Sequence, residues 1–180
     1  MTRSTAPSAR TKVRRLRELA RYDRSTIHAI LDEATVCHVG FVDEGQPFVI
    51  PTAIARINDH AYIHGSRVSR MLKLLAAGNP ACVTVTLLDG IVVARSAFNS
   101  SMNYRSVTVH GTATLIEGDE RVHALSVISE HVMPGRSEEV RPSHEKEILM
   151  TGVIQVEIES ASAKISMGPP DDEDGNDEGN

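Results

Sequence analysis

The chain has 180 residues, of which 41% are hydrophobic and 24% are charged, and its formal net charge is −5. This length suits one well-buried domain, and this composition is typical of globular proteins rather than disordered or fibrous ones. Because no run approaches the roughly 20 apolar residues of a membrane span, and no apolar signal segment follows the basic N-terminus, we expect a cytoplasmic protein with no membrane partner.

Charge is unevenly distributed along the chain. The N-terminal segment is basic and the last ten residues are acidic and glycine-rich. Since aromatic residues make up only 3% and no nucleic-acid recognition motif follows the basic segment, no nucleic-acid partner is expected. The sequence predicts a flexible basic arm over residues 1–21, a folded domain over 22–168 and a disordered acidic tail over 169–180.

The first predicted elements are a helix and a β-meander. Asp23 has the residue type of a helix N-cap, and apolar residues then recur at helical spacing at Ile27, Ile30 and Leu31. Apolar, β-branched runs separated by turn residues predict strands over 35–43, 47–57 and 60–65. Pro51 lies within the second run. Because proline cannot donate to a strand ladder, an edge or a bulge is predicted there.

In the second half of the chain, segments with the helical spacing of apolar residues alternate with segments that have the spacing of strands. After Ser66 a helical face is predicted from Val68, Met71, Leu72 and Leu75, and it ends at Gly78. Strands are predicted over 81–90, 91–98, 104–118 and 153–166, and helices over 118–133 and 142–150, the latter with Ser143 as its cap. Strands outnumber helices and most are joined as hairpins. The predicted fold class is therefore mainly β, an antiparallel β-barrel with peripheral helices.

The segment HGSRVSRMLK, residues 64–73, is the first candidate site. A strand ends there in a glycine-containing turn and a helix begins, so unsatisfied backbone N–H groups lie close to several polar side chains. Hydroxyls from Ser66 and Ser69 and positive charge from Arg67, Arg70 and Lys73 are what a phosphate monoester requires. The alternative interpretation is a capped helix with surface cations.

Two strand segments are further candidates. In NYRSVTV, residues 103–109, side-chain alternation places Tyr104 and Ser106 on one face and Arg105 on the other. Arg105 suits either a phosphate or a structural ion pair. In FVIPTA, residues 48–53, Pro51 leaves neighbouring backbone groups free for the edge of a flat heteroaromatic ring such as isoalloxazine, or it marks a plain bulge.

The histidines and cysteines predict no metal site. No HExxH pair occurs, and neither Cys37 nor Cys82 lies at ligand spacing to a histidine, so both cysteines are expected to be reduced core residues. His64 immediately precedes the predicted phosphate turn and is the one histidine for which a functional role is expected. GxSxG, P-loop and GxGxxG motifs are absent, which removes the usual support for hydrolase, NTPase and Rossmann functions.

Several of these segments, taken in order, resemble the flavin-nucleotide-binding proteins of the nitroimidazole-resistance branch of the pyridoxamine 5'-phosphate-oxidase-like superfamily. The segments are residues 22–75, then GIVVARSAF, NYRSVTVHG and SAKIS, so the resemblance covers the chain from about Tyr22 to about Gly168. The resemblance implies an FMN-binding antiparallel split barrel, usually a homodimer with two cofactors at the subunit interface.

The resemblance also implies roles for individual residues. It implies that the FMN phosphate is held by Ser69, Arg70 and Lys73. It implies that the flavin ring lies along Pro51, Thr52 and Ala53, with Ile50 next to them, and beside His64 and Gly65. It implies that the site is closed by Tyr104, Arg105 and Ser106, contributed by the other subunit.

The leading hypothesis is an FMN-dependent oxidoreductase that passes electrons from a small-molecule donor to a small organic acceptor such as a nitroaromatic. The flavin performs the redox chemistry, while the protein anchors the phosphate and orients the ring. His64 is the residue expected to serve any catalytic acid–base step, since imidazole titrates near neutral pH. The alternatives are a non-catalytic flavin carrier or sensor, and a split barrel that binds haem or a deazaflavin.

Overall fold

The computed structural model describes residues 8–158 and 160–170, and the rest of the predicted arm and tail lies outside these residues. Its elements, in chain order, are η1 (Arg17–Leu19), β1 (Ala20–Arg21), α1 (Arg24–Glu33), β2 (Val36–Asp43), β3 (Gln46–Ile57), β4 (His60–Ser66), α2 (Arg70–Ala76), β5 (Pro80–Val92), β6 (Ser101–Ile116), α3 (Gly118–Val132), α4 (Arg136–Glu139), α5 (Glu145–Met150), β7 (Thr151–Glu157) and β8 (Ser160–Ser166).

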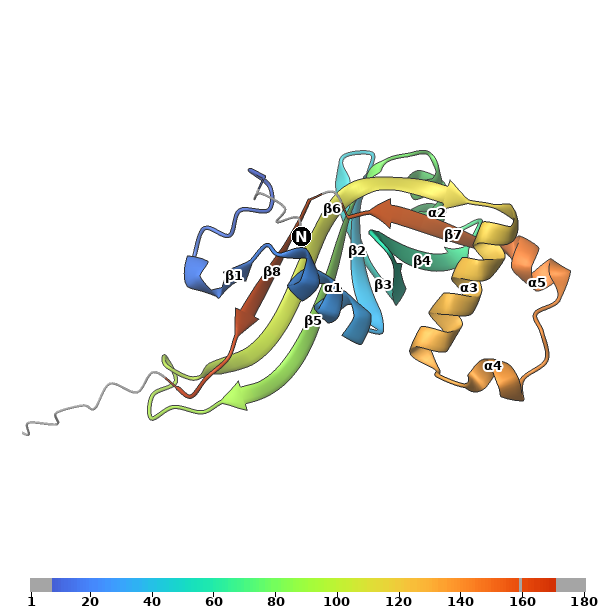
Figure 1. The fold of residues 1–180 in the computed structure, drawn as a ribbon. Helices are drawn as coiled ribbons and strands as arrows, with labels where there is room; N and C mark the ends of the chain where they lie inside the picture. The colour runs from blue at the N-terminus through green and yellow to red at the C-terminus, as the bar shows by residue number, and fades with distance from the viewer. Residues whose placement is uncertain (1–7, 159, 171–180) are drawn as a thin grey trace, which may run out of the picture.

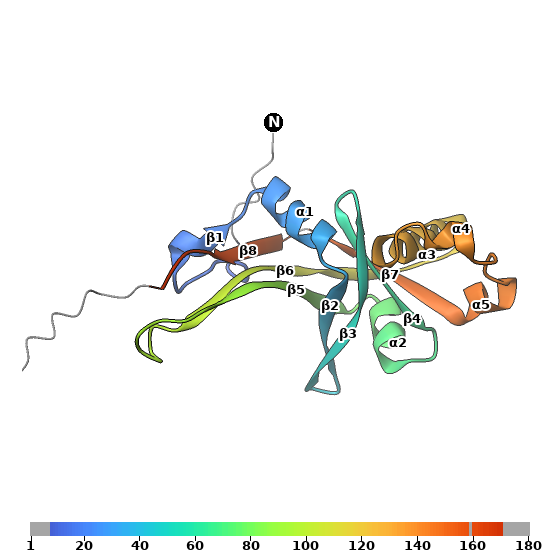
Figure 2. The ribbon, with the colours of Figure 1, turned by 90° about the horizontal axis from the view of Figure 1, so that it is seen from below.

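The strands of the described residues form one antiparallel sheet in the order β1-β8-β6-β5-β2-β3-β4-β7 (Figure 1). An additional pairing of β6 with β7 closes six of these strands into a ring, and β8 and β1 continue the sheet beyond it. Helices α3, α4 and α5 lie at the end of the molecule away from the loop that joins β5 to β6 (Figure 2). The predicted fold class, a mainly β antiparallel barrel with peripheral helices, is confirmed.

Helix α1 forms where the local signals place it. The side chain of Asp23 accepts a hydrogen bond from the backbone N–H of Thr26 at 2.8 Å, which satisfies one free donor of the first turn. Ile27, Ile30 and Leu31 are almost completely buried against the sheet. In the preceding segment, β1 pairs with β8 and Thr11 is buried. Thr11, Ala20 and Arg21, which belong to the expected flexible arm, are therefore buried or paired in the folded structure.

The hairpin of β2 and β3 turns on two residues, Glu44 and Gly45, which both have positive φ angles. This is the backbone conformation that suits a two-residue hairpin. β3 pairs with β2 from Gln46 to Ala53 and with β4 only from Ile54 onward. Pro51 therefore lies where β3 has a strand on one side only, so the predicted edge position is correct and no bulge interrupts the register with β2.

Three predicted boundaries are wrong. Helix α2 begins only at Arg70, with Ser69 as its cap, so Val68 lies outside it and is 75% exposed. Residues 80–92 form the single strand β5, with a register shift between Leu88 and Gly90, because β6 pairs on both sides of this irregularity. The separate strand predicted over 91–98 does not form. Helix α5 has His144 as its N-cap instead of Ser143, because the backbone N–H of His144 donates to Glu147.

Strand β6 changes its pairing partner along its length. It pairs with β8 up to His110 and with β7 from Ala113. Gly111 lies between the two ladders, where a Cβ atom would be 2.3 Å from the carbonyl oxygen of Glu157. Glycine is therefore required for β6 to pass this close to the end of β7.

The main core fills the barrel with aliphatic side chains, as the low aromatic content predicts. Cys37 is buried within it, and burial raises the pKa of its thiol to about 12. Cys82 is partly buried, and both thiols are free. A second cluster joins Ala124 and Ile128 of α3 to Tyr62 and Val153. Within the described ranges, every helix is too short or too polar to traverse a bilayer.

Candidate functional site

A cavity of about 450 Å³ lies between β3, the end of β4 and α2, and we call it the α2 cavity. It brings together eight of the predicted site residues: Ile50, Pro51, Thr52, His64, Gly65, Ser66, Ser69 and Arg70. Apolar side chains complete its wall: Phe41, Phe48, Met71 and Leu72. An apolar cavity with a few convergent polar groups has the character of a small-molecule site.

The part of β3 that pairs with β2 but not with β4 forms one wall of the α2 cavity. The β3–β4 ladder ends at the pair of Ile54 and Ile63, so the preceding residues of β3 diverge from β4. The Thr52 hydroxyl bridges the divergence by donating to the His64 carbonyl at 3.2 Å. A Cβ atom at Gly65 would be 2.9 Å from the side chain of Leu72, so glycine lets β4 approach α2 closely.

His64 lines the α2 cavity and has one unsatisfied ring nitrogen. Its Nδ1 atom is buried and has no hydrogen-bond partner among the described residues. Burial lowers the pKa of the imidazole, because the charged form loses solvation. The ring is therefore neutral at pH 7 and retains a nitrogen lone pair for a ligand.

Arg70 supplies the positive charge of the α2 cavity. Its guanidinium lies 4.7 Å from the centroid of the Phe48 ring, and that ring stacks on Phe41 with centroids 5.5 Å apart. The guanidinium also lies 3.4 Å from a carboxylate oxygen of Asp43, while the Arg70 side chain stays 58% exposed. Asp43 therefore competes with any anionic ligand of Arg70.

Ser69 has a local structural role. Its hydroxyl accepts from the backbone N–H of Leu72 at 3.3 Å and so caps α2. The capped-helix alternative is therefore present in the structure alongside the cavity. Since α2 spans only seven residues, its dipole is short, and we assign the anion-attracting charge to Arg70.

Five predicted site residues lie outside the α2 cavity: Ala53, Lys73, Tyr104, Arg105 and Ser106. Ala53 packs toward the cluster beneath α3. Lys73 lines a separate cavity of about 260 Å³ together with Arg67 and Gly152. Tyr104 and Ser106 lie on β6, opposite Leu88 and Thr86 of β5, and line neither cavity.

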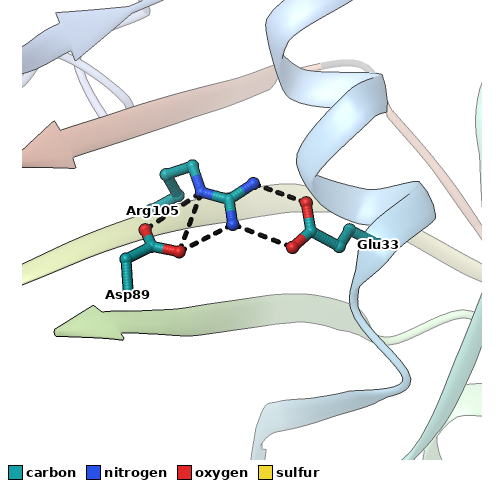
Figure 3. A network of polar contacts seen from close by, with 3 residues as sticks. All are labelled: Glu33, Asp89 and Arg105. Carbon is teal, nitrogen blue, oxygen red and sulfur yellow. Dashed lines mark hydrogen bonds and ion pairs between the residues drawn. The ribbon is translucent and has the colours of Figure 1, made fainter.

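Arg105 forms a structural ion pair, which is one of the two roles that its sequence context suggested (Figure 3). It donates to Glu33 of α1 at 2.8 Å and to Asp89 of β5 at 2.7 Å. These hydrogen bonds lower the pKa of both carboxyls and raise the pKa of the guanidinium. Because both carboxyl pKa values are lowered by folding, the network stabilises the fold above the unfolded carboxyl pKa and weakens as the pH falls. A phosphate-binding role for Arg105 remains a prediction.

A second cavity, of about 930 Å³, lies on the other face of the β2–β3 hairpin, and we call it the outer cavity. Its floor is a row of facing residues on β2, β5, β6 and β8: Gly40, Cys82, His110 and Ser160. Residues 8–10 also line it, and the hydroxyls of Ser8 and Ser160 are 2.7 Å apart. Phe41 and Phe48 line both cavities.

Sequence reasoning missed Phe41, Phe48 and Asp43. The signal available for the two phenylalanines is their equal spacing on either side of the turn DEGQ, which places them opposite each other in the hairpin. The outer cavity left no such signal, because its lining residues come from segments far apart in the chain.

Several solved structures are similar to this one. The flavocytochrome Anf3 from Azotobacter vinelandii is 45% identical, with a TM-score of 0.86, over 94% of this chain and 79% of that one. The FAD and haem binding protein from Mycobacterium smegmatis is 39% identical, with a TM-score of 0.81, over 87% and 77% of the two chains. A putative 5-nitroimidazole antibiotic resistance protein from Bacteroides thetaiotaomicron is 26% identical, with a TM-score of 0.66, over 81% and 86%.

The family assignment agrees with these structures. No curated protein matches the sequence. Residues 23–165, which include the α2 cavity and nearly the whole barrel, match the family described as pyridoxamine 5'-phosphate oxidase. The resemblance noted from the sequence motifs is thereby confirmed, and the chain belongs to the pyridoxamine 5'-phosphate oxidase family of flavin-binding split barrels.

Proposed function

We propose that this protein is a flavin-dependent oxidoreductase whose α2 cavity holds the isoalloxazine ring, ribityl chain and first phosphate of the flavin. The observation that carries the proposal is the convergence of β3, β4 and α2 on one apolar cavity with Arg70 at its edge. The exposed backbone edge of β3 suits the polar edge of the ring, and Arg70 suits the phosphate. When bound, the flavin supplies the redox chemistry, and the protein binds and orients it.

The sequence-based prediction for this flavin is FMN, while one relative at 39% identity is named for FAD. FMN and FAD share every group that the α2 cavity would contact. Flavin absorption bands in the purified protein, together with saturable quenching of flavin fluorescence, test the shared part of the proposal. Failure to bind either flavin contradicts it.

Turnover distinguishes an oxidoreductase from a flavin carrier or sensor. For an oxidoreductase, we expect the flavin-loaded protein to oxidise a reduced nicotinamide donor when a small nitroaromatic acceptor is present. The measurement is the loss of absorbance of NADPH or NADH over a panel of nitroaromatics. Stable flavin binding without turnover on any acceptor supports a carrier or sensor instead.

Haem binding is the second candidate function. Two relatives, at 45% and 39% identity, are a flavocytochrome and an FAD and haem binding protein by name. The residues present fit such a group, because His64 is a neutral imidazole with an unsatisfied ring nitrogen in an apolar cavity. Histidine is an axial ligand of haem iron in several classes of haem protein. We therefore propose haem, held by His64, as an alternative occupant of the α2 cavity in place of the flavin.

Replacing His64 with alanine is expected to abolish the shifted Soret band that haemin gives on binding the parent protein, because the iron loses its ligand. The measurement is an absorbance titration of the purified protein with haemin. His123→Ala, which changes an exposed histidine of α3, is the matched control and retains the band. A parent protein that leaves the Soret band of free haemin unshifted removes the haem proposal, and a parental shift in His64→Ala removes the role of His64.

We further propose a homodimer with the cofactor at the subunit interface. Tyr104 and Ser106 line neither cavity of their own chain, so a second copy is needed if they are to close a site. Apolar side chains near the β5–β6 loop are also exposed, Ile91 by 67%, Val93 by 77% and Phe98 by 96%. Exposed apolar surface of this kind marks interaction sites.

Light scattering of the flavin-loaded protein is expected to give twice the mass of the chain. Phe98→Asp is expected to weaken the dimer, because it places a charge in a surface that the second copy covers. Arg17→Asp, on the exposed part of η1, is a control expected to leave the mass unchanged. A stable flavin-loaded monomer of the parent protein contradicts the proposal.

A further inference from the structure

Helix α3 carries a row of side chains on a flank that lies outside the core. Val122, Ser126, Ser129 and Met133 follow one another at spacings of four, three and four residues, which aligns them along one side of a helix. None of the four belongs to the core clusters of the described residues. Val122 and Met133 are 46% and 50% exposed, so this flank of α3 is open to a further contact.

A cavity of about 440 Å³ lies between this row and the segment that returns through α4 to α5, and we call it the α3–α5 cavity. These helices lie at the end of the molecule away from the β5–β6 loop (Figure 1). The described residues that line the cavity are all different from those of the α2 cavity and the outer cavity. Its volume lies within the roughly 300–1,000 Å³ typical of small-molecule sites. It is therefore a candidate binding site separate from the proposed flavin site.

Much of the wall of the α3–α5 cavity is apolar. Its apolar side chains are Val122, Leu125, Met133, Val140, Pro142 and Ile148. Val140 is 43% exposed, so part of this apolar surface is in contact with solvent, and covering it with an apolar ligand is favourable. Hydroxyl groups of Ser126, Ser129 and Ser143 interrupt the apolar wall, and a hydroxyl can donate to an acceptor on the ligand.

The charged groups of the α3–α5 cavity are two arginines, and among the described residues no carboxylate lines it. Arg141 is already occupied, because both of its Nη atoms donate to Glu147. Arg136 donates to Glu139 through Nη1 alone, at 2.7 Å, and the two side chains are 52% and 68% exposed. An ion pair as exposed as this one contributes little. A ligand carboxylate can therefore replace Glu139 or accept from the remaining N–H groups of Arg136.

We propose that the α3–α5 cavity binds a carboxylate on an apolar body, of which a medium-chain fatty acid is the simplest form. The carboxylate accepts from the guanidinium of Arg136 and from the serine hydroxyls, while the chain covers the exposed surfaces of Met133 and Val140. A cationic head group would be repelled by the two arginines, and a neutral one would leave Arg136 without an anion. The proposal does not depend on flavin binding, since the described residues of the two sites are different.

The test is isothermal titration calorimetry of the full-length protein with octanoate, octanol and octyltrimethylammonium, with and without FMN. Octanoate is expected to bind at least about tenfold more tightly than octanol, and octyltrimethylammonium more weakly still. Arg136→Gln is expected to weaken octanoate binding about tenfold and to leave octanol binding unchanged, because it removes one charge-assisted hydrogen bond. Val140→Asp puts a carboxylate in the cavity wall and is expected to abolish octanoate binding. Because Arg136 and Val140 are both exposed, the fold does not depend on either side chain.

Lys146→Gln and Leu149→Asp are the matched controls, since both residues are exposed on α5 and lie outside the lining of the α3–α5 cavity. Both are expected to keep the parental affinity for octanoate. The proposal is overturned if octanoate does not bind, if octanol binds equally well, or if Arg136→Gln or Val140→Asp keeps the parental affinity. A loss that either control reproduces overturns it too, and so does octanoate binding that FMN abolishes, which would place octanoate in the α2 cavity. A lower mass of Val140→Asp in light scattering would assign this surface to a second copy of the chain instead.

Discussion

Arg70→Ala is expected to weaken flavin binding by about ten- to a hundredfold, which corresponds to roughly 1.5–3 kcal/mol for one charge-assisted hydrogen bond to a phosphate. Arg70 supplies the positive charge in the lining of the α2 cavity, and its guanidinium is held in place over the Phe48 ring. Removing it leaves the phosphate without that cation. Fluorescence titration with FMN and FAD measures the loss, which should be similar for both flavins because they share this phosphate.

Two further variants test whether the effect is local to Arg70. Asp43→Asn is expected to raise flavin affinity several-fold, because the carboxylate that now lies 3.4 Å from Arg70 no longer competes with the phosphate. Arg17→Ala removes an exposed arginine that lines neither cavity, and it should leave the affinity unchanged. Parental affinity in Arg70→Ala would falsify the assignment of the phosphate to this residue.

Gly111→Ala is expected to lower the free energy of unfolding by about 3 kcal/mol, at the upper end of the usual cost of overpacking. The added Cβ atom would lie 2.3 Å from the backbone carbonyl oxygen of Glu157, and a backbone group cannot rotate away as a flexible side chain can. The strands must then separate where β6 passes from β8 to β7. For a chain of this size the melting temperature should fall by roughly 6–12 °C.

Gly90→Ala is the matched control for this destabilisation. Gly90 lies at the register shift of β5, and no heavy atom lies within 4 Å of the Cβ position there. Alanine should therefore leave the melting temperature unchanged or slightly raised, since it reduces the entropy of the unfolded chain. Equal melting temperatures of the two variants in thermal unfolding would show that the close approach at Gly111 relaxes without cost.

Features that depend on neighbouring residues follow from the local sequence. The cap and buried face of α1, the turn between β2 and β3 and the one-sided position of Pro51 all follow from short-range patterns. Most of the α2 cavity was predictable for the same reason. Its polar residues lie in two short segments, 50–52 and 64–70, that the connection through β4 returns to the same edge.

The tertiary structure alone decided which distant residues meet. Arg105 finds Glu33 and Asp89, which lie 72 and 16 residues away in the chain, because α1 packs beside the β5–β6 ribbon. The floor of the outer cavity depends in the same way on the registers of four strands. A one-residue slip in any register would turn these side chains to the other face. Register is fixed by packing of the whole barrel, so no local pattern could have located either feature.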